Sequence, residues 1–170
     1  CGWMMWNWLV SVPASGATAV CYDGSPFHPG PAALADLAEA EALSFLGVSA
    51  KYLDSCRKAK FEPRHTHGLS SLRTIASTGS PLSPETATWV YEAFPRPIHL
   101  ASISGGTDLC GCFVCGDPTS PVYAGEIQRP ALGMAVEVWD AHGAPSPIGE
   151  RGELVCPAPF PSMPLEFFGD

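Results

Sequence analysis

Basic residues are scarce in this sequence. Its 170 residues include 9 Lys and Arg against 17 Asp and Glu, which leaves a net charge of -8 at pH 7. This balance argues against a surface that binds nucleic acid or an anionic membrane. A phosphate group bound by this chain must therefore be held by a local arrangement of donors.

A long uninterrupted hydrophobic run is also lacking. The most apolar stretch, CGWMMWNWLV at residues 1–10, has no basic segment before it, contains Asn7 and is followed by Pro13. These features are typical of neither a signal peptide nor a membrane span. We expect a buried helix from Trp3 to Val12 instead, in a cytoplasmic protein whose thiols are reduced.

Paired C-x-x-C knuckles, which form zinc ribbons, are lacking too. Of the seven cysteines, three crowd into the pattern Cys110-x-Cys112-x-x-Cys115. Thiolates this close can bind zinc or part of an iron–sulfur cluster, so a metal-binding module stays an alternative. No fourth ligand lies near them in the sequence, and free cysteine is commonly buried as a small hydrophobe. We therefore expect mostly buried thiols that serve packing.

The residues that are present form an alternating pattern. With 46% hydrophobic residues, a chain of this length can bury a sizeable core. Strand-like runs alternate with helical runs, which predicts an α/β fold with a mostly parallel sheet. Ser49 and Ser83 are the expected N-caps of two of the helices, and Pro84 suits a first helical position. The expected strands are residues 17–22, 43–48, 72–78 and 99–103, and the expected helices are residues 31–42, 50–59 and 84–94.

Two of the expected strands end in small, flexible residues. One end is Thr78-Gly79, and the other is Ile103-Ser104. Open parallel sheets bind their ligands beyond the carboxyl ends of the strands. The sequence therefore predicts a binding site at these two strand ends.

The segment Ser-Gly-Gly-Thr-Asp at residues 104–108 has the chemistry of a nucleotide site. Gly79 and the two glycines of this segment let backbone amides approach a flat ring or a phosphate. Thr107 adds a hydroxyl donor. Asp108 tolerates a phosphate only with a cation between them, and Mg²⁺ is the usual one. The pattern favours a nucleoside triphosphate with Mg²⁺, although all five residues are also common in simple turns.

The last part of the chain has a different sequence pattern. The runs MAVEVWD (residues 134–140) and ELVCP (residues 153–157) predict an antiparallel hairpin, with glycines and prolines between them and no helix. We expect residues 1–120 to belong to the α/β domain and residues 121–170 to begin a β-rich subdomain. His65 and His67, in the earlier loop FEPRHTHG, are expected to be solvated loop residues.

Several segments, read in order, resemble consecutive segments of the adenylate-forming acyl-CoA synthetases. They are CGWMMWNWLV, ASGATAVCYDGSP, STGSPLSPE, SISGGTD, PVYAGEIQRPALGMAVEVWD, GERGELVC and PFPSMPLEFFGD. The resemblance covers essentially the whole chain. It implies an enzyme that uses ATP and Mg²⁺ to convert a carboxylic acid, acetoacetate, to an acyl-adenylate, and then transfers the acyl group to coenzyme A. A nucleotide-binding or interaction domain without catalysis is the second alternative.

The resemblance also implies roles for single residues. Thr107 would contact the α-phosphate, and Asp108 would be the acid associated with magnesium, although the family usually has Glu there. Ser104 stands where an aromatic residue is often found. The nucleotide-binding residues implied by the resemblance are Gly79, Ser80, Pro81, Ser104, Gly105, Gly106 and Thr107.

The acyl pocket is implied in the same way. Trp3, Met4 and Met5 align with a helix that lines this pocket, and Gly105 aligns with a position that is Trp in enzymes that activate acetate. The family's phosphate loop would lie upstream of this sequence, and its ribose-binding aspartate and carboxy-terminal domain downstream. We therefore expect the 170 residues alone to be inactive.

Overall fold

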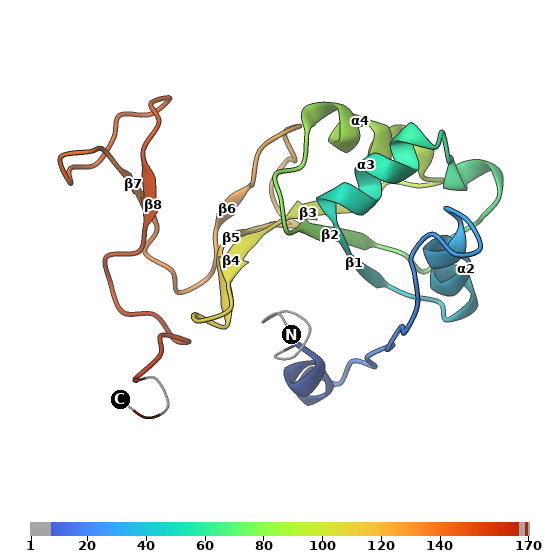
Figure 1. The fold of residues 1–170 in the computed structure, drawn as a ribbon, viewed down its shortest axis with the longest axis horizontal. Helices are drawn as coiled ribbons and strands as arrows, with labels where there is room; N and C mark the ends of the chain where they lie inside the picture. The colour runs from blue at the N-terminus through green and yellow to red at the C-terminus, as the bar shows by residue number, and fades with distance from the viewer. Residues whose placement is uncertain (1–7, 167–168, 170) are drawn as a thin grey trace. The chain divides into compact units, whose positions relative to one another are not determined.

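The computed structural model describes residues 8–166 and 169, which Figure 1 shows as a coloured ribbon. They group into two compact units, each built from separate stretches of chain. The sheet unit comprises Thr18–Ile103 and Gly116–Gln128. The hairpin unit comprises Cys1–Ala17, Ser104–Cys115 and Arg129–Asp170. The domain boundary expected after residue 120 stays a prediction.

The sheet unit is built on three parallel strands. They are β1 (Phe45–Ser49), β2 (Thr74–Thr78) and β3 (His99–Ser102), in the spatial order β1-β2-β3 (Figure 1). All the carboxyl ends lie at one edge, because the strands run in the same direction. The parallel sheet expected from the alternating pattern is confirmed.

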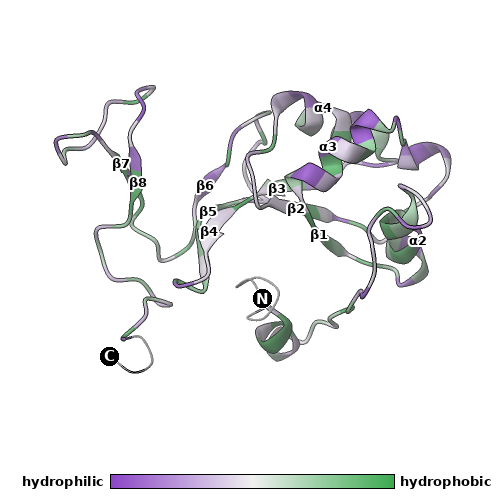
Figure 2. Ribbon diagram, in the orientation of Figure 1, coloured by the Kyte–Doolittle hydropathy of each residue, from purple (hydrophilic) through white to green (hydrophobic). Residues whose placement is uncertain are grey.

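Helices connect these strands. α3 (Ala50–Lys58) joins β1 to β2 and α4 (Pro84–Ala93) joins β2 to β3, while α2 (Ala33–Ala40) precedes β1 and a 3-10 turn, η2 (Pro63–His65), follows α3. The Ser49 hydroxyl caps α3 by accepting a hydrogen bond from the Tyr52 amide at 3.0 Å. Ser83 caps α4, so both predicted N-caps are confirmed. Figure 2 shows the contrast between the largely hydrophobic α2 and the hydrophilic stretches of α3.

The core of the sheet unit lies between its strands and helices. A fully buried Leu, Ile or Val side chain stabilises the folded state by about 1.5–3 kcal/mol relative to an exposed one. The core side chains of these types that are at most 1% exposed are Leu53, Leu72, Ile75, Val90 and Leu100.

One side chain holds the last stretch of the sheet unit together. The Gln128 amide nitrogen donates to the Asp117 and Ser120 carbonyls at 2.8 and 2.9 Å. Its oxygen accepts from the Asp117 amide at 2.9 Å and lies 3.0 Å from Nε2 of His99, the first residue of β3. Residues 116–128 are thereby fixed to the sheet.

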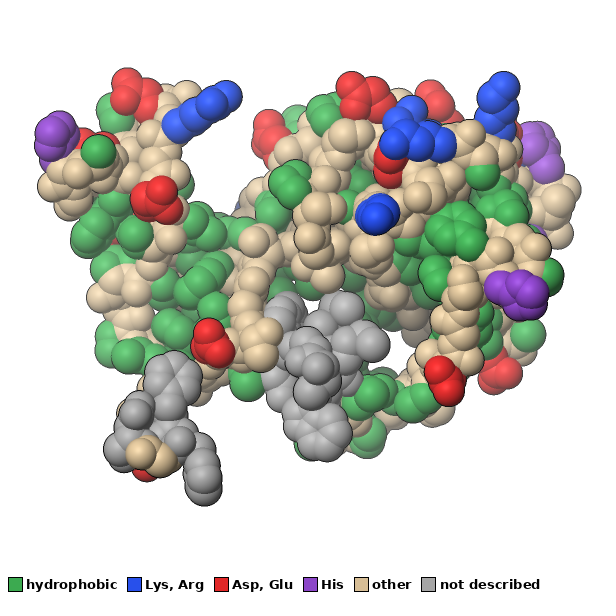
Figure 3. All heavy atoms as spheres, viewed as in Figure 1, with side chains coloured by type: hydrophobic (Ala, Val, Ile, Leu, Met, Phe, Trp, Pro, Cys, Tyr) green, Lys and Arg blue, Asp and Glu red, His purple; other side chains and the backbone are tan. Residues whose placement is uncertain are grey.

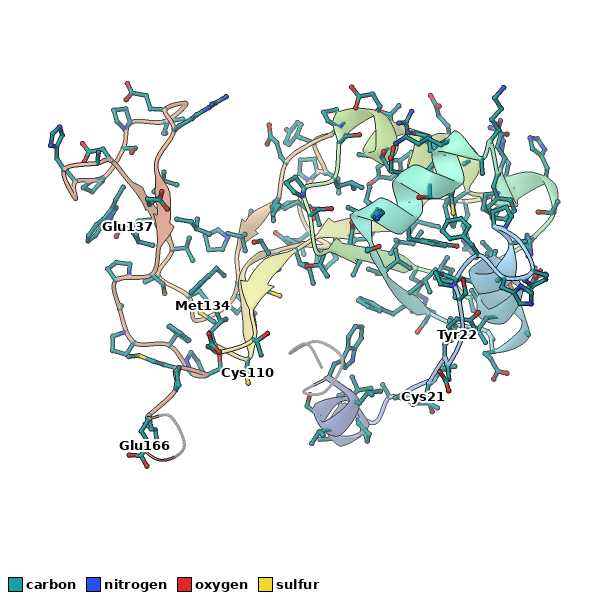
Figure 4. All side chains as sticks on the ribbon, in the orientation of Figure 1. Cys21, Tyr22, Cys110, Met134, Glu137 and Glu166 are labelled. Carbon is teal, nitrogen blue, oxygen red and sulfur yellow. The ribbon has the colours of Figure 1, made fainter. Side chains whose placement is uncertain are left out.

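Two expectations for the first part of the chain need correction. Residues 17–22 form no strand, and the side chains of Val20 and Tyr22 are 38% and 42% exposed; Figure 4 labels Cys21 and Tyr22 on this open stretch. A run with high β propensity becomes a strand only where a neighbouring strand completes its hydrogen bonds. The described part of the first helix is also not buried as expected, because the side chains of Leu9 and Val10 are 46% and 67% exposed. Residues 8–11 are helical and pass into the 3-10 helix η1 (Val12–Ser15), whose first turn tolerates proline.

The strands among the described residues of the hairpin unit are all short and antiparallel. β4 (Ser104–Gly106), β5 (Gly111–Cys115) and β6 (Arg129–Pro130) form one sheet in that order. β7 (Glu137–Trp139) pairs with β8 (Glu153–Val155), which confirms the predicted hairpin. None of the helices in the described ranges has the length and apolar character needed to cross a membrane.

Candidate functional site

The ends of β2 and β3 lie side by side. The Thr78 hydroxyl donates a hydrogen bond to the Ile103 carbonyl at 3.1 Å, and the Ile103 amide donates to the Ser77 carbonyl at 2.9 Å. The two chain segments therefore leave the sheet together, as the sequence predicts. Thr78 is not among the predicted site residues. Its signal in the sequence is its place as the last strand residue before a glycine.

The loop after β2 presents small residues to solvent. Gly79 has a φ of +85°, and a Cβ added to it would meet no atom within 4 Å. Glycine is therefore required by the left-handed backbone and not by crowding. Ser80 and Pro81 are exposed, whereas Leu82 is buried and anchors the loop in the core. We call residues 79–82 the glycine loop.

The segment predicted to bind the phosphates forms a strand and a turn. Ser104, Gly105 and Gly106 make up β4, which is irregular between Ser104 and Gly105. The turn at residues 107–110 is closed by a 3.1 Å hydrogen bond from the Cys110 amide to the Thr107 carbonyl. The alternative interpretation of residues 104–108 as a simple turn therefore holds only for Thr107 and Asp108.

Thr107 and Asp108 are both exposed at this turn. A hydroxyl donor and a carboxylate on adjacent residues suit a phosphate group and the hard cation that accompanies it. The exposure of the Asp108 carboxylate leaves room for a Mg²⁺ ion that keeps several of its waters. The residues present thus fit the predicted ligands.

Gly105 lies against the backbone of the neighbouring strand. A Cβ at this position would lie 2.0 Å from the Gly111 carbonyl oxygen and 2.7 Å from Cys112 Cα. This close approach requires glycine whatever the substrate is. The role of Gly105 in an acyl pocket stays a prediction, and Trp3, Met4 and Met5 lie outside the described residues.

The cysteines differ from expectation. Among the described cysteines only Cys56 is fully buried, while Cys110, labelled in Figure 4, is exposed. Burial, and next the nearby Cys115 thiol, raise the pKa of Cys112 to about 11. Cys112 is therefore a protonated thiol at neutral pH and a poor metal ligand. Within the described ranges no three His, Cys, Asp or Glu side chains are grouped so that they could hold a metal ion.

The two loop histidines have different environments. His65 is exposed, as expected. The side chain of His67 is only 6% exposed, and its Nε2 lies 2.8 Å from Asp36 Oδ1 of α2. Glu39, one turn further along α2, accepts from the Gly68 amide at 2.6 Å. The prediction of a solvated His67 is wrong, because α2 supplies partners that are distant in sequence.

The chain belongs to the family of AMP-binding enzymes, because the model of this family matches residues 1–162. This match confirms the resemblance found in the sequence.

Individual relatives are more specific. The chain is 58% identical to the acetoacetyl-coenzyme A synthetase of Rhizobium meliloti, over 100% of this chain and 26% of that protein. It is 48% identical to the acetoacetyl-CoA synthetase of Gallus gallus, over 99% of this chain and 25% of the relative. The structure of acetoacetyl-CoA synthetase from Streptomyces lividans superposes with a TM-score of 0.90 at 44% identity, covering 99% of this chain and 26% of that one. The chain thus spans about a quarter of the length of these relatives.

Proposed function

We propose that this chain is part of an AMP-forming acetoacetate–CoA ligase. In the first step, a carboxylate oxygen of acetoacetate attacks the α-phosphorus of ATP and pyrophosphate leaves. In the second step, the thiol sulfur of coenzyme A attacks the acyl carbon, its proton is lost and AMP leaves. The observation that carries the proposal is the 58% identity to an acetoacetyl-coenzyme A synthetase over the entire chain.

The site residues have distinct roles in this proposal. The adenine and AMP lie against the exposed residues of the glycine loop, which are Gly79, Ser80 and Pro81. The Thr107 hydroxyl donates to an α-phosphate oxygen, where negative charge grows as the carboxylate attacks. The Asp108 carboxylate would hold Mg²⁺, and the bound ion would supply positive charge to neutralise the phosphates.

The acyl side of the site is proposed on the sequence alone. Trp3, Met4, Met5 and Gly105 would line the pocket for the acyl chain. The partners are small molecules, ATP with Mg²⁺, acetoacetate and coenzyme A, and the cytoplasmic location expected from the sequence is part of the same proposal.

A chimera tests this function. The segment of the Rhizobium meliloti synthetase that matches this chain is replaced by the 170 residues, and the unmodified synthetase serves as the control. We expect the chimera to form acetoacetyl-CoA with release of AMP, and to prefer acetoacetate over acetate. A folded chimera that binds ATP but forms no thioester would contradict the proposal and favour a nucleotide-binding domain without catalysis.

A further inference from the structure

A chain of polar side chains connects α3 to the start of α4. The Ser83 hydroxyl donates to Thr86 Oγ1 at 3.1 Å, and the Thr86 hydroxyl donates to Asp54 Oδ1 of α3 at 3.4 Å. Ser83 also accepts from the Thr86 amide at 3.2 Å. These contacts run from Ser83 through Thr86 to Asp54, and the Ser83 side chain also forms a hydrogen bond with the side chain of Glu85. We call Ser83, Thr86 and Asp54 the polar relay.

The far end of the polar relay is a charged acceptor. Lys58 Nζ lies 2.5 Å from Asp54 Oδ2, and Arg57 Nη2 lies 2.8 Å from Asp54 Oδ1. Hydrogen bonds from Lys58 and then Arg57 lower the pKa of Asp54 to about 2, so this carboxylate is ionised at neutral pH. Figure 3 shows Lys and Arg side chains gathered over the α3 and α4 region of the sheet unit. The ionised carboxylate can only accept, so it orients the Thr86 hydroxyl toward α3, although the contact is longer than a strong O–H···O bond.

Thr86 is almost fully buried, although its side chain carries a polar hydroxyl group. It is 1% exposed and lies in the first turn of α4. Capping of this helix needs only the bond from the Thr86 amide to Ser83, which a Val at position 86 would keep. The hydroxyl of Thr86 is not needed for that capping bond, and its contacts to Ser83 and Asp54 link the start of α4 to α3.

Ser83 is the residue that directly follows the glycine loop. The other end of this loop is fixed by the bond from Thr78 to the Ile103 carbonyl. The loop is thus held at both ends by hydroxyl groups, at Thr78 from the strand side and at Ser83 from the helix side. Its exposed residues between these anchors are those that the proposed function places against the nucleotide.

We propose that Thr86 is a positioning residue for the nucleotide, which acts through Ser83 to set the glycine loop in its binding conformation. This inference rests on the proposed function and extends it to a buried residue that contacts no substrate.

The test compares three variants in the chimera described above. Thr86→Val removes the hydroxyl at nearly constant volume, and Thr86→Ser keeps it. Thr88→Val is the matched control, because Thr88 lies in the same helix but is exposed and bonds to the Pro84 carbonyl at 3.0 Å. The measurements are amide hydrogen exchange in residues 79–83 and the KM values for ATP and for acetoacetate.

We expect Thr86→Val to speed exchange in residues 79–83 and to raise the KM for ATP by about 5- to 10-fold, the factor for one buried hydrogen bond. The KM for acetoacetate should stay within about 2-fold, since the relay touches only the nucleotide side. Thr86→Ser and Thr88→Val should match the unsubstituted chimera in both measurements.

Three results would overturn the inference: unchanged exchange in Thr86→Val, equal damage in Thr86→Ser, or equal rises in both KM values. If Thr86→Val does not fold, Asp54→Ala, which removes the acceptor at the partly exposed end of the relay, takes its place, and unchanged exchange and KM for ATP in that variant would overturn the inference too. Hydrogen exchange needs no substrate, so it decides on the relay even if the chimera fails to activate acetoacetate, a result that would contradict only the proposed function.

Discussion

The Thr78 hydroxyl donates a hydrogen bond of 3.1 Å to the Ile103 carbonyl, and so joins the ends of two parallel strands. β2 is followed by the glycine loop and β3 by residues 104–108, the two segments to which the proposed function assigns nucleotide binding. The bond therefore holds the ends of β2 and β3 together.

Replacing Thr78 by Val should destabilise the protein by about 1 kcal/mol, because the hydroxyl is lost and the Ile103 carbonyl loses a donor. Urea unfolding of the chimera measures this change. Thr74→Val, on the same strand and the same face of the sheet, is the control. If both variants unfold at the same urea concentration as the unsubstituted chimera, the bond has no such role.

Gly105→Ala should destabilise the hairpin of β4 and β5 by about 1–3 kcal/mol, because the new Cβ would lie 2.0 Å from the Gly111 oxygen. Gly106→Ala is the control, since its Cβ would lie 3.4 Å from Leu109 Cδ2, near ordinary contact distance. We expect Gly105→Ala to lower kcat/KM for acetate and acetoacetate alike. A loss confined to acetoacetate would instead indicate that Gly105 acts through the acyl pocket.

Cys112 should react slowly with iodoacetamide at about pH 8, because burial raises the pKa of its thiol to about 11 and little thiolate is present below that pH. Its alkylation should accelerate as the pH approaches about 11. The exposed Cys110 should be modified first, and the two should react at similar rates in denaturant. Rapid alkylation of Cys112 in the folded protein at about pH 8 would show that its thiol is not protected.

The local signals in the sequence predicted most of the sheet unit. Ser49 and Ser83 were identifiable as N-caps because capping depends on a residue and the few that follow it. β2 and β3 are buried apolar runs, and such runs can also be recognised from a few consecutive residues of the sequence.

Features that depend on distant residues were not predictable in this way. Residues 17–22 have the composition of a strand, yet a strand also needs a neighbour. The His67 side chain is covered by partners that include Asp36 of α2, which is distant in the sequence. The same holds for the site: its glycines were identifiable, but the contact of Gly105 with Gly111 and the bond of Thr86 to Asp54 arise only in the folded chain.

Asp108 provides the most direct test of the proposed adenylating function. The measurement is single-turnover formation of acetoacetyl-adenylate by the chimera at varied Mg²⁺, alongside thioester formation from preformed adenylate.

We expect Asp108→Ala to slow adenylation by about 100-fold or more, because it removes a charge that organises Mg²⁺ at the phosphates. Thioester formation should change much less, and Asp108→Glu, which restores the carboxylate usual in the family, should retain most of the adenylation rate. Equal losses in both half-reactions, or an unchanged adenylation rate in Asp108→Ala, would contradict the account.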